Sequence, residues 1–185
     1  MFYTLEVAGL KRDLELFPVS DKLQIAAFLM MCDQELTVKC AAELLKRAPE
    51  YDYLLTAEAK SIPLIHEMAR QSGAKRYCVA RKRVKVYMGK PIEVEVHSIT
   101  TAGMQKLYLP ENEAALIRGK RVLLVDDVIS TGESLAALEK LVVAAGGMVA
   151  GRMAVLAEGD AVKRNDICVL APLPLFTADG QPIKG

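Results

Sequence analysis

The most constraining feature of this sequence is a run of four apolar residues set between charged ones. Residues 122–125 (Val-Leu-Leu-Val) follow two cations and precede Asp126 and Asp127. A short apolar run of this kind is typical of a strand that is buried on both faces of a parallel sheet. A helical pattern of leucine and valine begins at Leu135. The sequence therefore predicts a strand, a loop and a helix, which is the repeating unit of an α/β fold.

The loop between this strand and helix has the composition of an anion-binding site. The N–H groups of a helix's first turn and the helix dipole attract a phosphate. Two carboxylates would repel that phosphate, so Asp126 and Asp127 must face another part of the ligand, either a divalent cation or sugar hydroxyls. A ribose 5-phosphate has both parts. The loop residues are small and mostly carry hydroxyls: Ser130, Thr131, Gly132, Glu133 and Ser134.

Composition excludes several other classes of protein. The 185 residues carry a net charge of +1 and only 5% aromatic residues, so no nucleic-acid surface is indicated and the ligand should be small. No apolar run approaches the length of a membrane span, and the N-terminus does not read as a signal peptide. We expect a cytoplasmic protein without membrane contact. The cysteines form no C-x-x-C pair, which indicates reduced thiols: Cys32, Cys40, Cys78 and Cys168.

Four further segments read as buried strands, at 53–56, 77–80, 148–156 and 167–170, with helical segments between them. Five strands that alternate with helices predict a doubly wound parallel sheet. Cations follow two of these strands, and ligands bind at the carboxyl ends of strands in open α/β sheets. The alternative interpretation is that these cations are only solvated surface residues and bind no ligand. The residues concerned are Lys60 and Ser61 after the first of these strands and Arg81, Lys82 and Lys85 after the second.

The central strand, the acid pair and Ser-Thr-Gly-x-Ser resemble the phosphoribosyl diphosphate (PRPP) motif of type I phosphoribosyltransferases, closest to the adenine and xanthine enzymes. Residues 58–61 resemble the Glu-Ala-Arg-Gly of adenine enzymes, but Lys60 replaces the arginine and Ser61 replaces the glycine. Residues 81–85 match the Arg-Lys-x-x-Lys of the same enzymes. The resemblance implies pyrophosphate binding by Lys60, Ser61, Arg81, Lys82 and Lys85, ribose binding by the acids, and 5-phosphate binding by residues 130–134.

The resemblance also implies a reaction, in which ribose 5-phosphate passes from PRPP to a purine nitrogen and pyrophosphate leaves. Mg²⁺ would bind the pyrophosphate and ribose oxygens, with Asp126 and Asp127 reaching it through ribose or water. Together with Lys60 and Arg81, these acids would be the catalytic residues, and a homodimer is common in the family. The alternative is a non-catalytic regulator of the same fold that senses PRPP or a nucleotide. Such regulators add a DNA-binding domain, and no basic recognition helix is found here.

One domain is expected, with an N-terminal hood over the base at about 1–50, a core at about 51–170 and a C-terminal surface arm at about 171–185. The hood is predicted to hold a strand at 2–7, a helix that carries Leu23, Ala26, Ala27 and Met30, and a second helix at 35–47. Met30 and Met31 are expected in the core. Apolar and polar residues alternate at 92–98, which predicts a strand. Together with 99–109, this segment matches the flap that closes over the site in the phosphoribosyltransferases it resembles, with the tip at 100–103.

The choice of base rests on Glu158. It follows the strand at 148–156 and aligns with a lysine that contacts the base in xanthine enzymes. A carboxylate accepts hydrogen bonds, so it favours the amino group of adenine over the carbonyl oxygens of xanthine. The alternative is that Glu158 only begins a solvated turn.

Overall fold

The fold is built on a five-stranded parallel sheet, seen in a computed structural model that describes residues 1–97 and 104–183. The strand order is β10-β9-β8-β4-β5, and every neighbouring pair is parallel. The carboxyl ends of all five strands therefore lie along one edge. This confirms the predicted doubly wound sheet. Its strands are β4 (Tyr53–Ala57), β5 (Cys78–Ala80), β8 (Arg121–Ile129), β9 (Met148–Glu158) and β10 (Cys168–Leu173).

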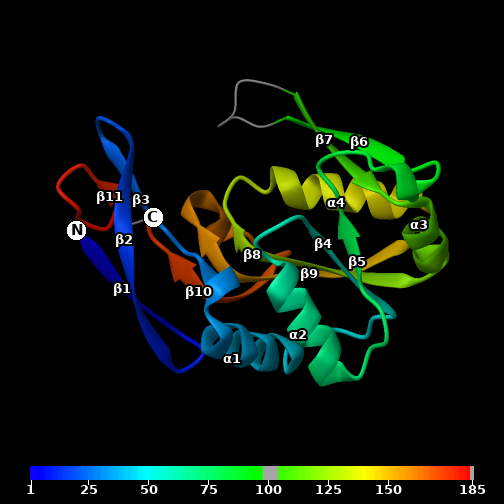
Figure 1. Cartoon of the computed structure of the whole chain (residues 1–185). Coiled ribbons are helices and arrows are strands. Elements are labelled where there is room, and N and C mark those ends of the chain that lie inside the picture. The colour runs from blue at the N-terminus through cyan, green and yellow to red at the C-terminus, as the bar shows by residue number, and fades with distance from the viewer. Residues whose placement is uncertain (98–103, 184–185) are drawn as a thin grey trace.

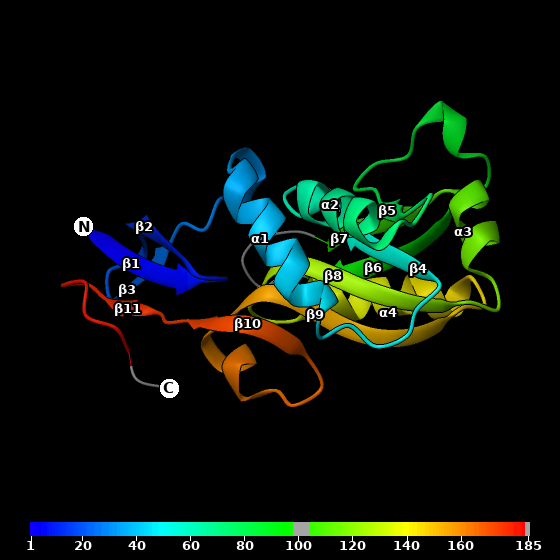
Figure 2. The same ribbon diagram turned by 90° about the horizontal axis from the view of Figure 1, so that it is seen from below.

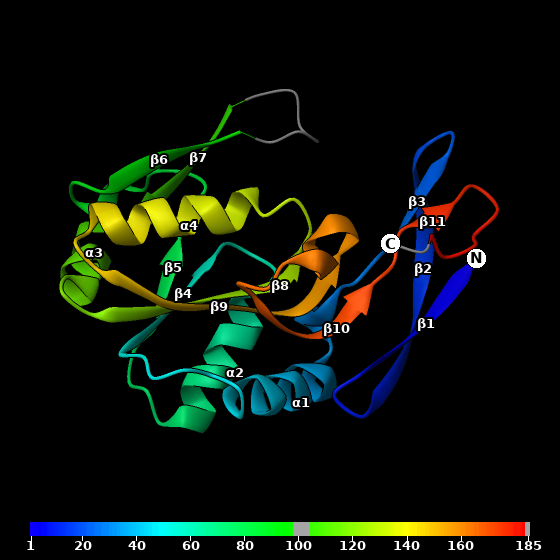
Figure 3. The same ribbon diagram turned by 180° about the vertical axis from the view of Figure 1, so that it is seen from behind.

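Helices cover both faces of this sheet (Figures 1 and 3). α1 (Gln34–Leu45) and α2 (Ile62–Ser72) pack on one face, and Figure 2 shows them in front of the strands. α4 (Glu133–Ala144) covers the other face, and α3 (Glu111–Ile117) leads into β8. Leu123 and Val125 belong to the core on the α1 and α2 side, while Val122 and Leu124 belong to the core on the α4 side. The central strand is thus buried on both faces, as its apolar run predicts.

The ends of α2 follow the local sequence. Pro63 lies in the first turn, where its missing N–H removes no helical hydrogen bond. Gly73 ends the helix with φ +74°, a left-handed conformation that costs glycine little. Among the described residues, no helix is both long and apolar enough to cross a membrane.

A second sheet, the N-terminal sheet, stands beside the carboxyl edge of the central sheet (Figure 1). Its order is β1-β2-β3-β11, and neighbouring strands are antiparallel. The prediction of a helix that carries Leu23 and Ala26 is wrong, because Leu23–Ala26 is a strand that pairs with β2 and β11 on its two sides. Only two residues, at 8–9, connect the predicted strand β1 to β2, which begins at Leu10. The strands are β1 (Phe2–Val7), β2 (Leu10–Ser20), β3 (Leu23–Ala26) and β11 (Phe176–Thr177).

The C-terminal segment is not the surface arm that its prolines suggest. Leu173 and Phe176 are each 1% exposed. The side chain of Gln24 in β3 donates hydrogen bonds to the backbone oxygens of Thr177 and Ala178, at 3.1 and 2.8 Å. Residues distant in sequence thus complete the N-terminal sheet, and the two ends of the described chain lie close together (Figure 1).

The predicted flap is an antiparallel hairpin of β6 (Ile92–His97) and β7 (Met104–Leu109), which packs against α4. Ile92 and Val94 are half-buried and Glu93 and Glu95 are exposed, so the alternation at 92–95 is confirmed. The tip predicted at 100–103 lies outside the described residues. The part of the chain that the structure describes also holds three short 3₁₀ helices: η1 (Met30–Cys32), η2 (Val86–Met88) and η3 (Gly159–Lys163).

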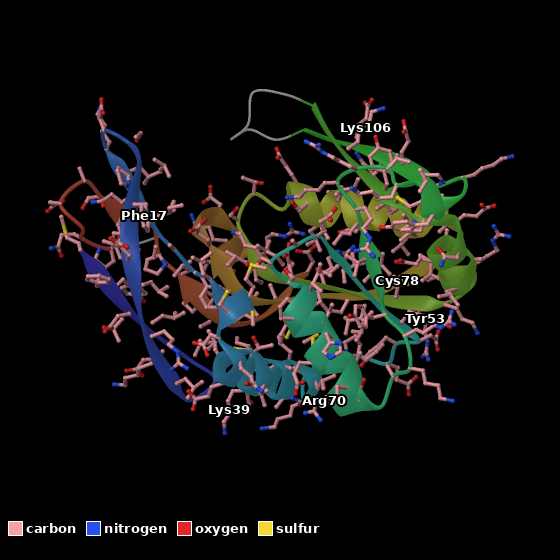
Figure 4. All side chains as sticks on the ribbon, in the orientation of Figure 1. Phe17, Lys39, Tyr53, Arg70, Cys78 and Lys106 are labelled. Carbon is pink, nitrogen blue, oxygen red and sulfur yellow. The ribbon has the colours of Figure 1, made fainter. Side chains whose placement is uncertain are left out.

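Side-chain burial separates the two methionines that were both expected in the core. Met30 is fully buried, whereas Met31 is 46% exposed. The four cysteines are free, and burial raises the pKa of both Cys40 and Cys78 to about 12, so their thiols stay protonated. Figure 4 shows Lys39 and Arg70 projecting from α1 and α2 away from the sheet.

Candidate active site

The two acids lie near the end of the central strand, and a serine from the next strand's loop joins them. β8 runs through the acids to Ile129, beyond the end that the sequence predicts. Ser61 follows β4, and its Oγ lies 2.6 Å from Oδ1 of Asp126 and 3.1 Å from Oδ1 of Asp127. The backbone N–H of Asp127 donates to Ser61 Oγ and to Asp126 Oδ1, at 2.9 Å in each case. The three residues therefore form one hydrogen-bonded acid cluster.

Burial and charge determine what this acid cluster can bind. Asp127 is 5% exposed, and its Oδ2 has no hydrogen-bond partner among the described residues. Burial, and then the charge of Asp127, raise the pKa of Asp126 to about 7. Hydrogen-bond donors and cations stabilise carboxylates in this condition. The cluster therefore favours a ligand that brings hydroxyl groups or a cation to the strand end.

The residues after β8 are the ones predicted to form an anion cradle. Gly132 is the N-cap of α4 and has φ +81°, which favours glycine. Gly132 has no side chain to cap the helix, and the N–H of Glu133 makes only a long hydrogen bond, 3.4 Å, to Thr131 Oγ1. The N–H groups of the first turn are therefore largely available to a ligand. A small recess is lined by residues 130–134 together with Asp126 and Val128. The loop at 130–134, which is predicted to bind a phosphate, is thus adjacent to the acid cluster.

Arg164, which the sequence analysis does not select, lies against this cradle. A Cβ added to Gly132 would overlap Nη1 of Arg164 and lie 3.7 Å from its Cζ. Asp166 accepts hydrogen bonds from Nε and Nη2 of the same guanidinium, at 2.9 and 2.7 Å. These two hydrogen bonds to Asp166 fix the guanidinium so that its Nη1 faces the loop. No motif marks Arg164, because it comes from the far end of η3 and reaches the loop only through the fold.

The predicted cations separate into two groups. Lys60 and Lys82 line one cleft with the acid cluster, Ser134 and Leu107 of β7. Arg81 does not line it: its Nη2 lies 3.9 Å from Glu113 of α3, and its backbone pairs with Tyr108. Lys85 also lies outside that lining, at the start of η2. The structure therefore brings Lys60 and Lys82, but not Arg81 and Lys85, to the acids.

Lys82 is held at the cleft by its own loop. Its backbone N–H donates to Oε2 of Glu58 at 2.5 Å, which connects the loop after β5 to the loop after β4. The peptide bond between Glu58 and Ala59 is cis. The two lysines thus come from neighbouring parallel strands, at one edge of the sheet.

Glu158 is the last residue of β9 and is half-buried at the same edge. Burial raises the pKa of its carboxyl, and the charge of Lys60 partly offsets this shift. Glu158 is not among the residues that line the cleft with Lys60 and Lys82. Glu158 therefore lies close enough to Lys60 to feel its charge, but outside the lining of the cleft.

The acid cluster suits a magnesium ion in part. Within residues 1–97 and 104–183, no group of three or more His, Cys, Asp or Glu side chains could hold a metal alone. Mg²⁺ is usually bound by one or two carboxylates together with water and substrate phosphates. The unpartnered Oδ2 of Asp127 and the neighbouring Asp126 fit this pattern. They could hold the ion together with a phosphorylated substrate.

Known proteins resemble this chain in sequence and in fold. A hypoxanthine/guanine phosphoribosyltransferase from Methanotorris igneus is 32% identical over 148 residues, which are 79% of this chain and 73% of that protein. Adenine phosphoribosyltransferase from Thermoanaerobacter pseudethanolicus superposes with a TM-score of 0.70 at 20% identity, over 86% of this chain and 95% of the other.

A third relative is adenine phosphoribosyltransferase from Saccharomyces cerevisiae, whose crystal structure holds adenine and an imino-altritol bisphosphate. It superposes with a TM-score of 0.68 at 22% identity, over 85% of this chain and 93% of the other. The sequence profile of the phosphoribosyl transferase domain matches residues 33–171. This chain belongs to the phosphoribosyl transferase domain family.

Proposed function

We propose that this protein is a purine phosphoribosyltransferase, which transfers ribose 5-phosphate from PRPP to a purine and releases pyrophosphate. One observation carries the proposal: the acid cluster lies between the anion cradle of residues 130–134 and a cleft lined by Lys60 and Lys82. PRPP has the matching order of groups, with a 5-phosphate, ribose hydroxyls and a pyrophosphate. The name of the relative in Methanotorris igneus supports the same reaction.

Each group of residues has a role in this reaction. The cradle at 130–134 binds the 5-phosphate, and Asp126 and Asp127 accept hydrogen bonds from the ribose hydroxyls. Positive charge grows on the ribose as the bond to pyrophosphate breaks, and the two carboxylates balance it. Lys60 and Lys82 stabilise the charge that develops on the leaving pyrophosphate. Mg²⁺, when bound, neutralises further phosphate charge.

The base is proposed to be adenine, although the relatives point in two directions. The sequence relative is named for hypoxanthine and guanine, and the similar structures are named for adenine. Glu158 at the end of β9 supports adenine, because a half-buried carboxylate accepts a hydrogen bond from an amino group. A 6-oxo purine would instead place a carbonyl oxygen against that carboxylate.

A transfer assay tests both parts of this proposal, the transfer reaction and the preference for adenine. The protein is incubated with PRPP and Mg²⁺, each nucleobase is offered in turn, and released pyrophosphate is measured. We expect turnover with purines and the highest kcat/KM with adenine. Glu158→Lys should lower that preference, whereas Glu50→Lys, on a side chain paired with Arg121 at the opposite edge, should not. Turnover that is highest with hypoxanthine or guanine would refute the adenine proposal alone. PRPP binding without any turnover would favour the regulator.

A further inference from the structure

Ser61 occupies a helix N-cap but does not cap its helix. A serine at this position usually accepts a hydrogen bond from the N–H of the second or third helical residue. The Ser61 side chain makes no such bond, and Pro63 at one of these positions has no N–H to donate. The hydroxyl is directed instead to the acid cluster, 2.6 Å from Asp126. Its function is therefore to be found at the acids.

The backbone at Ser61 does not require a particular residue. Its φ of −85° and ψ of 0° are accessible to any L-amino acid. Glycine stands here in the loops that this segment resembles, so the hydroxyl is a feature of this chain. The side chain is 1% exposed, which leaves no room for it to turn toward solvent. Among the described residues, its hydrogen-bond partners are the two acids, and these bonds satisfy the polar group.

The hydroxyl holds both acids at once. It donates its one proton toward Asp126 Oδ1, the nearer acceptor, and it accepts the backbone N–H of Asp127 at 2.9 Å. Oδ1 of Asp127 lies 3.1 Å from the same hydroxyl oxygen, Ser61 Oγ. Two carboxylates this close repel each other, and a shared donor between them offsets part of that repulsion. Removing the hydroxyl frees both side chains to rotate apart.

Ser61 also follows Lys60 directly. The residue that lines the pyrophosphate side of the cleft is therefore linked, through one peptide bond and one hydroxyl, to the acids on the ribose side. A ligand that spans both sides needs them at a fixed separation.

We propose that Ser61 is a positioning residue, which fixes the rotamers of Asp126 and Asp127 and their distance from Lys60 before PRPP binds. This rests on the proposed function only for the identity of the ligand. The hydroxyl is already bonded to Asp126 and Asp127. It acts through the acids, so its loss should affect PRPP and leave the purine site unchanged.

The test compares three substitutions at Ser61 with one control. Ser61→Ala and Ser61→Gly remove the hydroxyl, and Ser61→Thr keeps it. Thr37→Val is the control, since Thr37 is another buried hydroxyl, bonded to backbone oxygens at the start of α1, far from the acids in the chain. PRPP binding is measured by calorimetry, and KM for PRPP and for the base by steady-state kinetics.

We expect Ser61→Ala and Ser61→Gly to weaken PRPP binding roughly tenfold to a hundredfold, as for the loss of a hydrogen bond to a charged group. KM for the base should change less than about twofold, because the hydroxyl does not reach it. Ser61→Thr should restore most of the PRPP affinity. Thr37→Val should lower the melting temperature without changing PRPP binding.

Wild-type PRPP affinity in Ser61→Ala and Ser61→Gly would overturn the proposal. Equal losses for PRPP and base would also overturn it, since they would show a general structural role. If Ser61→Thr does not fold, Ser61→Ala and Ser61→Gly still test whether the hydroxyl is needed for PRPP binding. Wild-type protein that binds PRPP but transfers nothing would refute the proposed enzyme, and the binding comparison would still test Ser61.

Discussion

Asp126→Asn should make the protein more stable while it lowers PRPP affinity. Burial and the charge of Asp127 raise the pKa of Asp126 from 3.8 to about 7, so at pH 8 the folded protein holds a carboxylate that is more costly there than in the unfolded chain. A shift of about 3 units corresponds to ~4 kcal/mol at about 1.36 kcal/mol per unit. Because Asp126 is only part-buried, solvent screens this interaction, and we expect about 2 kcal/mol.

The pH dependence gives this prediction its sign. The folded-state pKa lies above the unfolded value, so the cost is complete above about pH 7 and disappears as the pH falls toward 3.8. At pH 8 the variant should melt roughly 4–8 °C above wild type. The difference should narrow below pH 7 and vanish near pH 4.

Thermal unfolding of both proteins from pH 4 to 8 measures this difference in stability. Groups distant from the acid cluster titrate alike in both proteins, so their contributions cancel. Asp21→Asn, an exposed acid in the turn between β2 and β3, serves as the control and should change neither stability nor binding. In Asp126→Asn, PRPP affinity should fall roughly tenfold or more through the lost charged hydrogen bond. A melting temperature at pH 8 equal to or below wild type would refute the reasoning.

Three further predictions follow from the site. Lys82→Ala should lower kcat/KM for PRPP roughly tenfold through a lost phosphate contact, while Arg81→Ala, outside the cleft, should lower it less; the reverse order in steady-state kinetics would contradict the geometry. Gly132→Ala should raise KM for PRPP and lower stability by ~1–2 kcal/mol, whereas Gly9→Ala, with φ +76° and open space around it, should lower stability only. Arg164→Gln should raise KM for PRPP roughly two- to fivefold and weaken its salt dependence, and an unchanged KM would exclude Arg164 from the phosphate site.

Local sequence was sufficient for the central sheet and its loops. The apolar run at 122–125 predicts a doubly covered strand, because burial on both faces leaves no position for a polar side chain. Gly73 and Pro63 mark the ends of α2 through backbone conformations that few other residues share. The acid pair and the small-residue loop are contiguous in the chain, so their proximity in space also follows from sequence.

The N-terminal sheet could not be predicted in the same way. Leu23 and Ala26 have helical spacing, but residues 23–26 form a strand because β2 and β11 offer hydrogen-bonding edges on its two sides. β11 begins at Phe176, so half of that environment lies about 150 residues away in the chain. Local propensity contains no information on such a partner.

Within the candidate site, the sequence determined which residue types are present, and the tertiary structure decided which of them meet. Arg81 and Lys82 are adjacent in the chain, yet Lys82 lines the cleft and Arg81 turns toward Glu113. Ser61 reaches the acids and Arg164 reaches Gly132 from other strands' loops. The physical reason is that successive side chains at a strand end point in opposite directions, and contacts across a sheet depend on register, which no local pattern of residues specifies.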